Sequence, residues 1–165
     1  MTIYLCGFMG CGKTTVGKVL AGKLHQTYTD MDSFIVQCER MSIANIFANM
    51  GESYFRQRET QAIGQLGDLG GIIACGGGAM LKEENARIAS EKGKVVYIDT
   101  PFDVCYSRIE GDTTRPIVVS NTRHSLEELY NTREKLYSAN SAYTVDGTGT
   151  PDEIADRIIS LLNIK

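Results

Sequence analysis

The sequence predicts an α/β protein built as a three-layer α/β/α sandwich, with a central parallel sheet of about five strands. Two observations predict this class. Short apolar runs alternate along the chain with longer segments of helical periodicity, which is typical of a parallel sheet covered by helices on both faces. The length of 165 residues fits a single domain, and neither a linker nor an internal repeat divides it.

The expected strands are five short apolar runs, at 3–6, 28–29, 72–75, 95–98 and 142–145. Helices are expected to begin where a capping residue precedes proline, at 100–101 and 150–151. A capping box, in which Ser or Thr is followed three residues later by Glu, is expected at Thr150 and at Ser125.

The composition argues against a general nucleic-acid binder. Lys and Arg number 17 against 20 Asp and Glu, a net charge of −3, whereas sequence-independent nucleic-acid binding needs a basic surface. Five cysteines without a C-x-x-C pair, and only two histidines, indicate reduced thiols rather than disulfides or a metal centre. No apolar run is long enough for a membrane span, and the first residues lack the basic start of a signal peptide. We therefore expect a cytoplasmic monomer that acts on small molecules and binds neither nucleic acid nor membrane.

Residues 7–14 fit the phosphate-binding pattern G-x-x-x-x-G-K-[ST] without a mismatch. The segment follows an expected strand and precedes a helical pattern, so its backbone N–H groups and the helix N-terminus would surround a phosphate. Lys13 is expected to reach the outer phosphates of a nucleotide, and Thr14 to bind Mg²⁺. The fold is thus of the P-loop NTPase type, with its P-loop at 7–15 and nucleotide contacts from Gly10, Cys11, Gly12, Lys13, Thr14 and Thr15.

The P-loop leaves the phosphoryl acceptor open between water, water with a switch function, and an organic acceptor. A GTPase switch would carry the guanine-reading tetrapeptide Asn-Lys-x-Asp, which is absent. The segment 68–71 imitates the D-x-x-G switch element but lacks the apolar strand that should precede it. The acceptor must therefore be inferred from polar residues at the carboxyl edge of the sheet, where open α/β sheets bind ligands.

Asp30 and Asp32 directly follow the second expected strand. The pair can simply cap the next helix. Beside a P-loop, one carboxylate can instead serve Mg²⁺, directly or through water, while the other accepts a hydrogen bond from an acceptor hydroxyl. Such a base needs only modest basicity, because phosphoryl transfer is mostly positioning and charge stabilisation.

Two arginines interrupt apolar helix faces. At 100° per residue, Glu59 and Arg56 fall near the centre and on the flank of a stripe made by Phe55, Ala62, Ile63, Leu66 and Leu69. The two can form an exposed ion pair, or pair while the Arg56 fork still holds a ligand carboxylate. Arg133 falls in the middle of a second stripe, made by Leu126, Leu129, Tyr130, Leu136 and Tyr137. Two inward arginines without evident partners suggest an anionic substrate distinct from the nucleotide.

Three further features complete the candidate site. The glycine triplet 76–78 follows the third expected strand, either as a flexible turn or as a point of close approach for a ligand. The irregular segment 110–124 is expected to be a mobile lid, from which Arg115 could swing over the γ-phosphate. Arg108 and Pro151 could sandwich the adenine ring.

In combination, these motifs resemble the shikimate kinase family over almost the whole chain. The P-loop is common to many kinases, whereas the order and spacing of the other motifs are specific. The matching segments 7–17, 30–32, 51–59, 76–78, 115–116 and 133–137 read GFMGCGKTTVG, DMD, GESYFRQRE, GGG, RP and REKLY.

The resemblance implies an ATP-dependent phosphotransferase that uses Mg²⁺ to phosphorylate the 3-hydroxyl of shikimate, in the chorismate pathway of aromatic amino acid biosynthesis. It implies that Lys13 and Arg115 stabilise the transferring phosphoryl group, that Asp30 supports Mg²⁺ and that Arg108 contacts adenine. Asp32 would position the reacting hydroxyl, within a substrate-binding region at about 32–60. The residues implied to hold shikimate are Asp32, Arg56, Gly76, Gly77, Gly78 and Arg133.

The chain departs from the family pattern at positions away from these inferred contacts. Val36 stands where Glu is common, Met41 where a glycine precedes Ser-Ile, and Ile117 with Val118 where a Leu pair is usual. These differences bear on helix and lid packing rather than on chemistry. The alternatives are a gluconate-type or nucleoside monophosphate kinase, or a nucleotide-binding switch or regulatory module.

Overall fold

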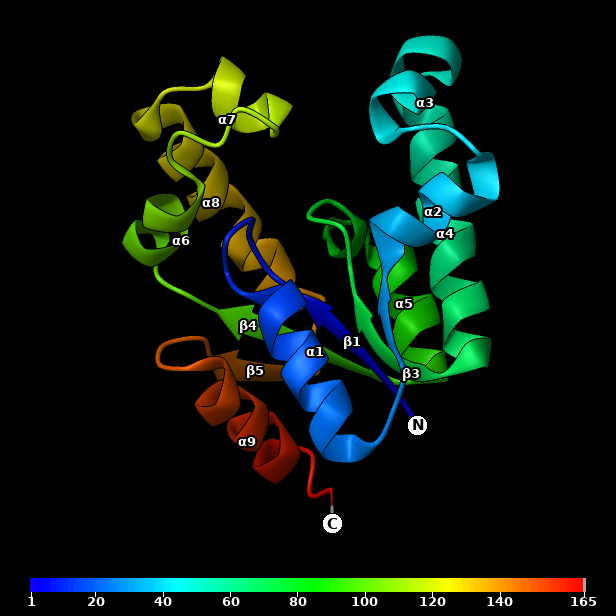
Figure 1. The fold of residues 1–165 in the computed structure, drawn as a ribbon, viewed down its shortest axis with the longest axis vertical. Coiled ribbons are helices and arrows are strands. Elements are labelled where there is room, and N and C mark those ends of the chain that lie inside the picture. Colours follow the sequence, from blue (N-terminus) through cyan, green and yellow to red (C-terminus); the bar gives the residue numbers. More distant parts are fainter. Residues whose placement is uncertain (165) are drawn as a thin grey trace.

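The computed structural model describes residues 1–164, over which five strands form one parallel sheet. The strands are β1 (Thr2–Cys6), β2 (Tyr28–Asp30), β3 (Gly71–Ala74), β4 (Lys94–Asp99) and β5 (Tyr143–Asp146). Their order across the sheet is β2-β3-β1-β4-β5, and each neighbouring pair is parallel (Figure 1). The predicted sheet is confirmed, because every predicted strand end lies within one residue of the observed one.

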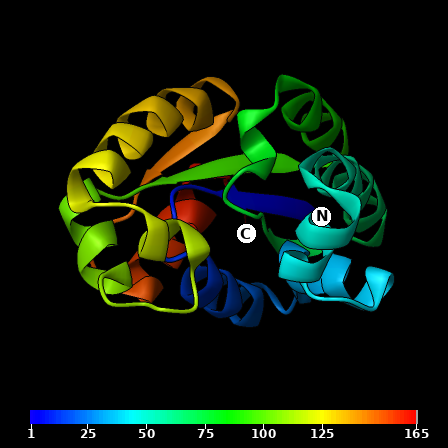
Figure 2. The ribbon, with the colours of Figure 1, turned by 90° about the horizontal axis from the view of Figure 1, so that it is seen from above.

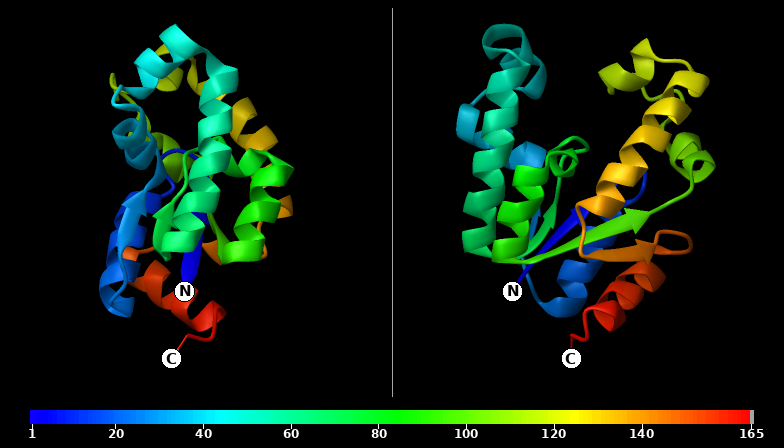
Figure 3. Two further views of the ribbon diagram at one scale, coloured as in Figure 1. Left: turned by 90° about the vertical axis from the view of Figure 1, so that its right-hand side faces the viewer. Right: turned by 180° about the vertical axis from the view of Figure 1, so that it is seen from behind.

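Helices cover both faces of the sheet and make the predicted three-layer sandwich (Figure 3). One face carries α1 (Lys13–Leu24) and α9 (Pro151–Leu161), which pack together; the other carries α4 (Glu52–Leu69), α5 (Glu83–Lys92) and α8 (Arg123–Ala139). The central strand β1 contacts both layers. The Tyr4 hydroxyl donates a hydrogen bond of 2.8 Å to the Ile63 carbonyl of α4, while Leu5 faces α1.

The remaining helices stand above the carboxyl ends of the strands in two groups (Figures 1 and 2). One group, α2 (Met31–Glu39) and α3 (Ile43–Met50), packs on α4; the other, α6 (Phe102–Ile109) and α7 (Pro116–Ser120), lies on the side of α8. The short 3-10 helix η1 (Ala79–Leu81) connects β3 to α5. Of the helices described between residues 1 and 164, none is long and apolar enough to cross a membrane.

The core is centred on β1, whose Ile3, Tyr4 and Leu5 have no exposed surface. Burial on both faces explains why this strand reads as an unbroken apolar run rather than an alternating pattern. All five cysteines are free thiols, and four of them are buried, whereas Cys38 on α2 is exposed. Burial raises the pKa of the Cys6 thiol to about 12.

Of three predicted helix starts, the structure confirms one and contradicts two. The capping box at Thr150 is confirmed, with hydrogen bonds in both directions between Thr150 and Glu153. Helix α6, however, begins after Pro101, because the Thr100 hydroxyl donates instead to the Cys11 carbonyl at 3.1 Å. Helix α8 begins before Ser125, and the capping residue is Thr122, whose hydroxyl accepts a hydrogen bond from the Ser125 N–H.

The two predicted helical stripes are buried except at Leu129, which is half-buried, and at Leu69 and Leu136, which are 75% and 40% exposed. Leu69 is the last residue of α4, beyond the part of the helix that the core covers. Leu136 lies about 80° around the helix from Leu126, outside the buried face. The 110–124 segment is also more regular than expected, because it contains the short helix α7, with Pro116 at its first position.

Substitutions at two glycines of α4, three residues apart, distinguish the effect of helix propensity on stability from the effect of packing. A Cβ added at Gly67 would lie 2.8 Å from Lys92 Cβ and closer still to the Tyr4 hydroxyl, whereas one added at Gly64 meets nothing within 4 Å. We expect Gly67→Ala to lower the free energy of unfolding by about 1–3 kcal/mol. Gly64→Ala should raise it by about 0.5–1 kcal/mol. Urea denaturation followed by circular dichroism measures both, and equal changes in the two variants would contradict the packing argument.

Candidate active site

A cavity of about 620 Å³ opens at the carboxyl edge of the sheet. It brings together residues that the sequence distributes over the P-loop, the region after β2 and β3, the α6–α7 segment and the start of α9. The predicted site residues that line it are Gly10, Gly12, Lys13, Thr14, Thr15, Asp30, Asp32, Gly76, Gly77, Arg108, Arg115 and Pro151. The predicted residues outside its lining are Cys11, Arg56, Gly78 and Arg133.

The P-loop forms the turn between β1 and α1, and glycines shape its backbone. Gly10 and Gly12 have φ angles of 79° and 104°, and α1 begins at the next residue, Lys13. The Lys13 ammonium donates hydrogen bonds to the carbonyls of Gly7 at 2.6 Å and Phe8 at 3.2 Å, so it lies over the loop. A helix N-terminus beneath a lysine-covered loop is suited to binding the phosphates of a nucleotide.

Two side chains from other elements fix this loop. The Thr100 hydroxyl donates to the Cys11 carbonyl at 3.1 Å, and the Arg108 guanidinium donates to the Gly10 carbonyl at 2.9 Å. The Cys11 side chain is buried and lies outside the cavity lining. Arg108 lines the cavity together with Pro151, the first residue of α9. Neighbouring lining residues that the sequence patterns did not predict are Ile109, Gly149 and Ile154.

Asp30 and Asp32 have different environments. Asp30 is the last residue of β2 and caps α2, with its Oδ1 accepting a hydrogen bond of 2.8 Å from the Ser33 N–H. Asp32 lies in the first turn of α2, and no group among residues 1–164 hydrogen-bonds its buried Oδ1. Burial, and then the charge of Asp30, raise the pKa of the Asp32 carboxyl above its usual value, against the opposing charges of Lys13, Arg56 and Arg115. Asp32 Oδ1 is therefore a buried polar atom without a hydrogen-bond partner among the described residues, which suits a ligand-binding role.

The glycine turn after β3 touches both Asp32 and Arg56. A Cβ added at Gly76 would lie 2.7 Å from Asp32 Oδ1, and one added at Gly78 would lie 2.5 Å from Arg56 Nη1. Arg56 Nη1 donates to Glu59 Oε2 at 2.9 Å, and its Nη2 donates to Glu52 Oε1 at 3.3 Å. A side chain at Gly76 or Gly78 would therefore displace the end of a charged side chain, Asp32 or Arg56, from its place beside the turn.

Glu59 is the buried member of this cluster, with 1% of its surface exposed. Burial raises the pKa of the Glu59 carboxyl, and the hydrogen bond and charge of Arg56 oppose that increase. The Arg56 side chain remains 37% exposed. The predicted pairing of Arg56 with Glu59 is confirmed, and it leaves the outer part of the guanidinium accessible to a ligand.

Arg133 reaches the same turn from α8. A Cβ added at Gly77 would lie 3.7 Å from Arg133 Nη1, and the charge of Arg133 also acts on Glu59. Tyr137, one helical turn later, donates a hydrogen bond of 2.5 Å to the Gly77 carbonyl. Arg56 and Arg133 therefore flank the glycine turn beside the cavity rather than line the cavity itself.

The backbone around the glycine turn is held by polar residues that the sequence patterns did not predict. Asn85, which is buried, donates to the Ala79 carbonyl at 2.9 Å, and Asn140 donates to the Met80 carbonyl at 2.8 Å. The sequence could have indicated Tyr137, since it lies four residues after Arg133 on the same helix face. No sequence pattern indicates the two asparagines, because the carbonyls that they contact lie on another element.

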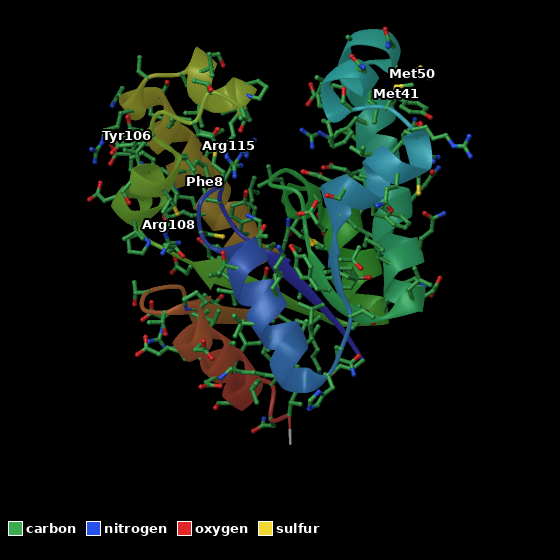
Figure 4. All side chains as sticks on the ribbon, viewed as in Figure 1. Phe8, Met41, Met50, Tyr106, Arg108 and Arg115 are labelled. Atoms are coloured by element: carbon green, nitrogen blue, oxygen red, sulfur yellow. The ribbon has the colours of Figure 1, made fainter. Side chains whose placement is uncertain are left out.

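Arg115 approaches the cavity from the segment before α7. Figure 4 shows Arg115 and Arg108 on the side of α6 and α7, across from Met41 and Met50 near the tip of the α2–α3 group. Arg115 Nε pairs with Asp112 Oδ2 at 3.0 Å, and the side chain lines the cavity. A cation from the predicted lid thus faces the P-loop site.

The oxygen donors present fit Mg²⁺ bound with a nucleotide. Thr14 and Asp30, which carry a hydroxyl and a carboxylate, both line the cavity. Within residues 1–164, no group of three His, Cys, Asp or Glu side chains is arranged to hold a metal ion. Mg²⁺ in kinases is commonly bound through one or two protein oxygens, phosphates and waters, so a full protein cage is not needed.

A family model described as shikimate kinase matches residues 9–163. The chain belongs to the shikimate kinase family. A shikimate kinase from Persephonella marina is 40% identical to it, over 95% of this chain and 96% of that protein. The solved shikimate kinase of Acinetobacter baumannii in complex with shikimate is 35% identical, with a TM-score of 0.89 over 98% of this chain and 92% of that one.

One alternative kinase class is similar in fold alone. A gluconokinase from Sinorhizobium meliloti is 15% identical, with a TM-score of 0.62 over 98% of this chain and 91% of that one. At this identity the likeness shows a shared fold and carries no information on the acceptor. The gluconate-type alternative is therefore not favoured, because the chain belongs to the shikimate kinase family.

Asp32→Asn tests the cost of burying this carboxylate. Because the pKa of Asp32 is raised, the native state binds its proton more tightly than the unfolded chain does, and stability falls as pH rises toward the raised pKa. We expect the variant to raise the thermal midpoint at pH 7, by about 2–4 °C for each kcal/mol of relief. The gain should shrink as the pH is lowered through the raised pKa, because the wild-type carboxyl is then neutral.

Scanning calorimetry between pH 4 and pH 8 measures this gain. Asp103→Asn is the matched control, because Asp103 is an exposed aspartate on α6 whose carboxylate pairs with Arg123. This substitution should change the free energy of unfolding by less than about 0.5 kcal/mol, as is usual for surface positions. A loss of stability in Asp32→Asn, or a gain that does not depend on pH, would contradict the interpretation.

Proposed function

We propose that this protein transfers the γ-phosphate of ATP, with Mg²⁺, to the 3-hydroxyl of shikimate, giving shikimate 3-phosphate for aromatic amino acid biosynthesis. Membership of the shikimate kinase family supports this reaction. The observation that carries the proposal is the second cationic cluster, in which Arg56 and Arg133 flank the glycine turn next to the P-loop cavity. A small hydroxy acid has both the carboxylate and the hydroxyls that such a cluster can bind.

On the nucleotide side, the P-loop residues from Gly10 to Thr15 bind the phosphates through backbone N–H groups. Lys13 exchanges its contacts with the loop carbonyls for phosphate oxygens. Arg108 and Pro151 enclose the adenine ring. Mg²⁺, held by Thr14 and Asp30, supplies charge neutralisation and orientation of the phosphates when bound.

On the acceptor side, Arg56 and Arg133 bind the shikimate carboxylate, and the glycine turn at 76–78 allows the ring to approach the backbone. Asp32 accepts a hydrogen bond from the 3-hydroxyl, whose oxygen attacks the γ-phosphorus as the bond to the ADP oxygen breaks. The hydroxyl proton leaves to the Asp32 carboxylate. Lys13 and Arg115 stabilise the charge on the transferring group. The raised pKa of Asp32 supports this role, because it makes the carboxylate a better proton acceptor.

We extend the proposal to the organisation of the chain. Residues 1–165 form one kinase domain, with a substrate-binding region at about 32–60 and a lid at about 110–124 that closes over bound ligands. The common sheet of β1 to β5 supports the single domain. The enzyme acts in the cytoplasm as a monomer. The five free thiols support the cytoplasmic location, because disulfides are rare in that compartment.

An acceptor panel tests the reaction. ADP release, measured by a coupled assay, should be at least about a hundredfold faster in kcat/KM with shikimate than with gluconate or nucleoside monophosphates, since a ligand whose polar groups are arranged differently leaves buried polar groups of the site unpaired. Turnover on one of the other acceptors but not on shikimate would overturn the assignment. ADP release that is independent of every acceptor would indicate a switch or regulatory module.

Arg133→Ala tests the anion-binding role. A lost hydrogen bond to a charged group costs about 1.5–3 kcal/mol, so shikimate should bind about tenfold or more weakly, while the Kd for ATP stays within about twofold. Lys135→Ala, an exposed cation on the same helix, should change neither. Isothermal titration calorimetry measures both ligands, and equal losses for ATP and shikimate would assign Arg133 a structural role instead.

A further inference from the structure

Tyr28, the first residue of β2, packs its ring against α1 at Gly17. A Cβ added at Gly17 would lie 2.7 Å from Tyr28 Cε2 and 3.1 Å from Cδ2. Cε2 neighbours the ring carbon that bears the hydroxyl, so the hydroxyl half of the ring occupies the space that the glycine leaves. Lys18 contacts the same ring, with its Nζ 5.9 Å from the centroid. A glycine inside a helix costs about 1 kcal/mol relative to alanine, so this close approach is maintained against helix propensity.

The ring brings the Tyr28 hydroxyl to the residues of the metal site. Thr14 precedes Gly17 by three positions on α1, and therefore lies on the same helix face, one turn closer to the P-loop. Tyr28 and Asp30 are two positions apart on β2, so their side chains share one face of the strand. The hydroxyl thus lies on the side of α1 that carries Thr14 and on the strand face that carries Asp30.

The Tyr28 hydroxyl is buried, and no group among residues 1–164 completes a hydrogen bond of ordinary geometry with it. Buried polar groups rarely lack a partner, and an unpaired one is destabilising. The Thr14 side chain is the neighbouring hydrogen-bonding group on α1. A phenylalanine would fill the same space at Gly17 without leaving this polar atom unpaired, so packing alone does not explain the tyrosine.

We propose that Tyr28 is a positioning residue for the metal–nucleotide site, whose hydroxyl accepts a hydrogen bond from the Thr14 hydroxyl and so turns the Thr14 oxygen toward the cation. An alcohol that gives a lone pair to a divalent cation directs its O–H proton away from the metal, and that proton needs an acceptor. The Tyr28 oxygen is a neutral acceptor already buried next to Thr14. The proposal rests on the metal-binding part of the proposed function and is independent of which acceptor is phosphorylated.

Tyr28→Phe removes this oxygen and keeps the ring on Gly17. We expect the affinity for ADP, measured by isothermal titration calorimetry, to fall about three- to tenfold in the presence of Mg²⁺, which is the effect of one ordinary hydrogen bond. In excess EDTA the affinity should stay within about twofold of the wild type. Tyr143→Phe is the matched control, because Tyr143 lies on β5 and its hydroxyl accepts a hydrogen bond from Lys94 at 3.2 Å. It should leave both affinities unchanged.

A double-mutant cycle with Thr14→Ala separates positioning from structure. If Tyr28 acts through the Thr14 hydroxyl, Tyr28→Phe should have no further effect on Mg²⁺-dependent ADP binding once Thr14 is alanine. The thermal midpoint of the ligand-free protein should not fall in Tyr28→Phe, because the atom removed is an unpaired one. Additive losses in the cycle, an unchanged affinity in Mg²⁺, or equal losses in Mg²⁺ and EDTA would overturn the proposal. None of these measurements uses shikimate, so a wrong acceptor assignment would leave them unaffected.

Discussion

The ion pair between Arg56 and Glu59 is the interaction on which the acceptor side of the cavity depends. Glu59 is almost fully buried, and a buried carboxylate left without its cation destabilises a protein by about 3–5 kcal/mol. The pair therefore fixes the guanidinium against Gly78, and through it the spacing between α4 and the turn after β3. Asp32 approaches the same turn from α2 at Gly76, so the two helices and the turn form one charged assembly. Bulky side chains in the turn would separate these parts.

Charge placement, rather than total charge, determines what this protein can bind. The net charge of −3 describes a mildly acidic surface. In and beside the cavity, however, the charges of Lys13, Arg56 and Arg115 all act on Asp32, and that of Arg133 acts on Glu59. Cations gathered at one cleft focus positive potential toward anionic ligands, even when the total charge of the protein is negative. An acidic protein can thus accept a nucleotide and a second anion in adjacent positions.

The sequence predicts those features that local patterns specify and misses those that depend on contacts between distant segments. The strands and the P-loop were predictable because apolar runs and glycine spacing report directly on local conformation. The pairing of Arg56 with Glu59 was predictable because helix periodicity placed the two side chains next to each other. The start of α6 was not, since Thr100 bonds to the P-loop carbonyl of Cys11 instead of capping its own helix. The environment of Tyr28 was equally hidden, because it depends on the absence of a side chain at Gly17, in another element.

The distribution of the cysteines has a practical consequence for measurements of motion. Cys6, Cys11, Cys75 and Cys105 are buried, and burial raises the pKa of Cys6, Cys75 and Cys105, which keeps those thiols protonated and unreactive. Cys38 is exposed on α2, in the helix that begins with the two aspartates of the site. A maleimide dye added to the native protein would therefore attach at one position, without any engineered substitution. A dye on Cys38 would therefore report on motion of α2, on the acceptor side of the cavity, in the wild-type protein.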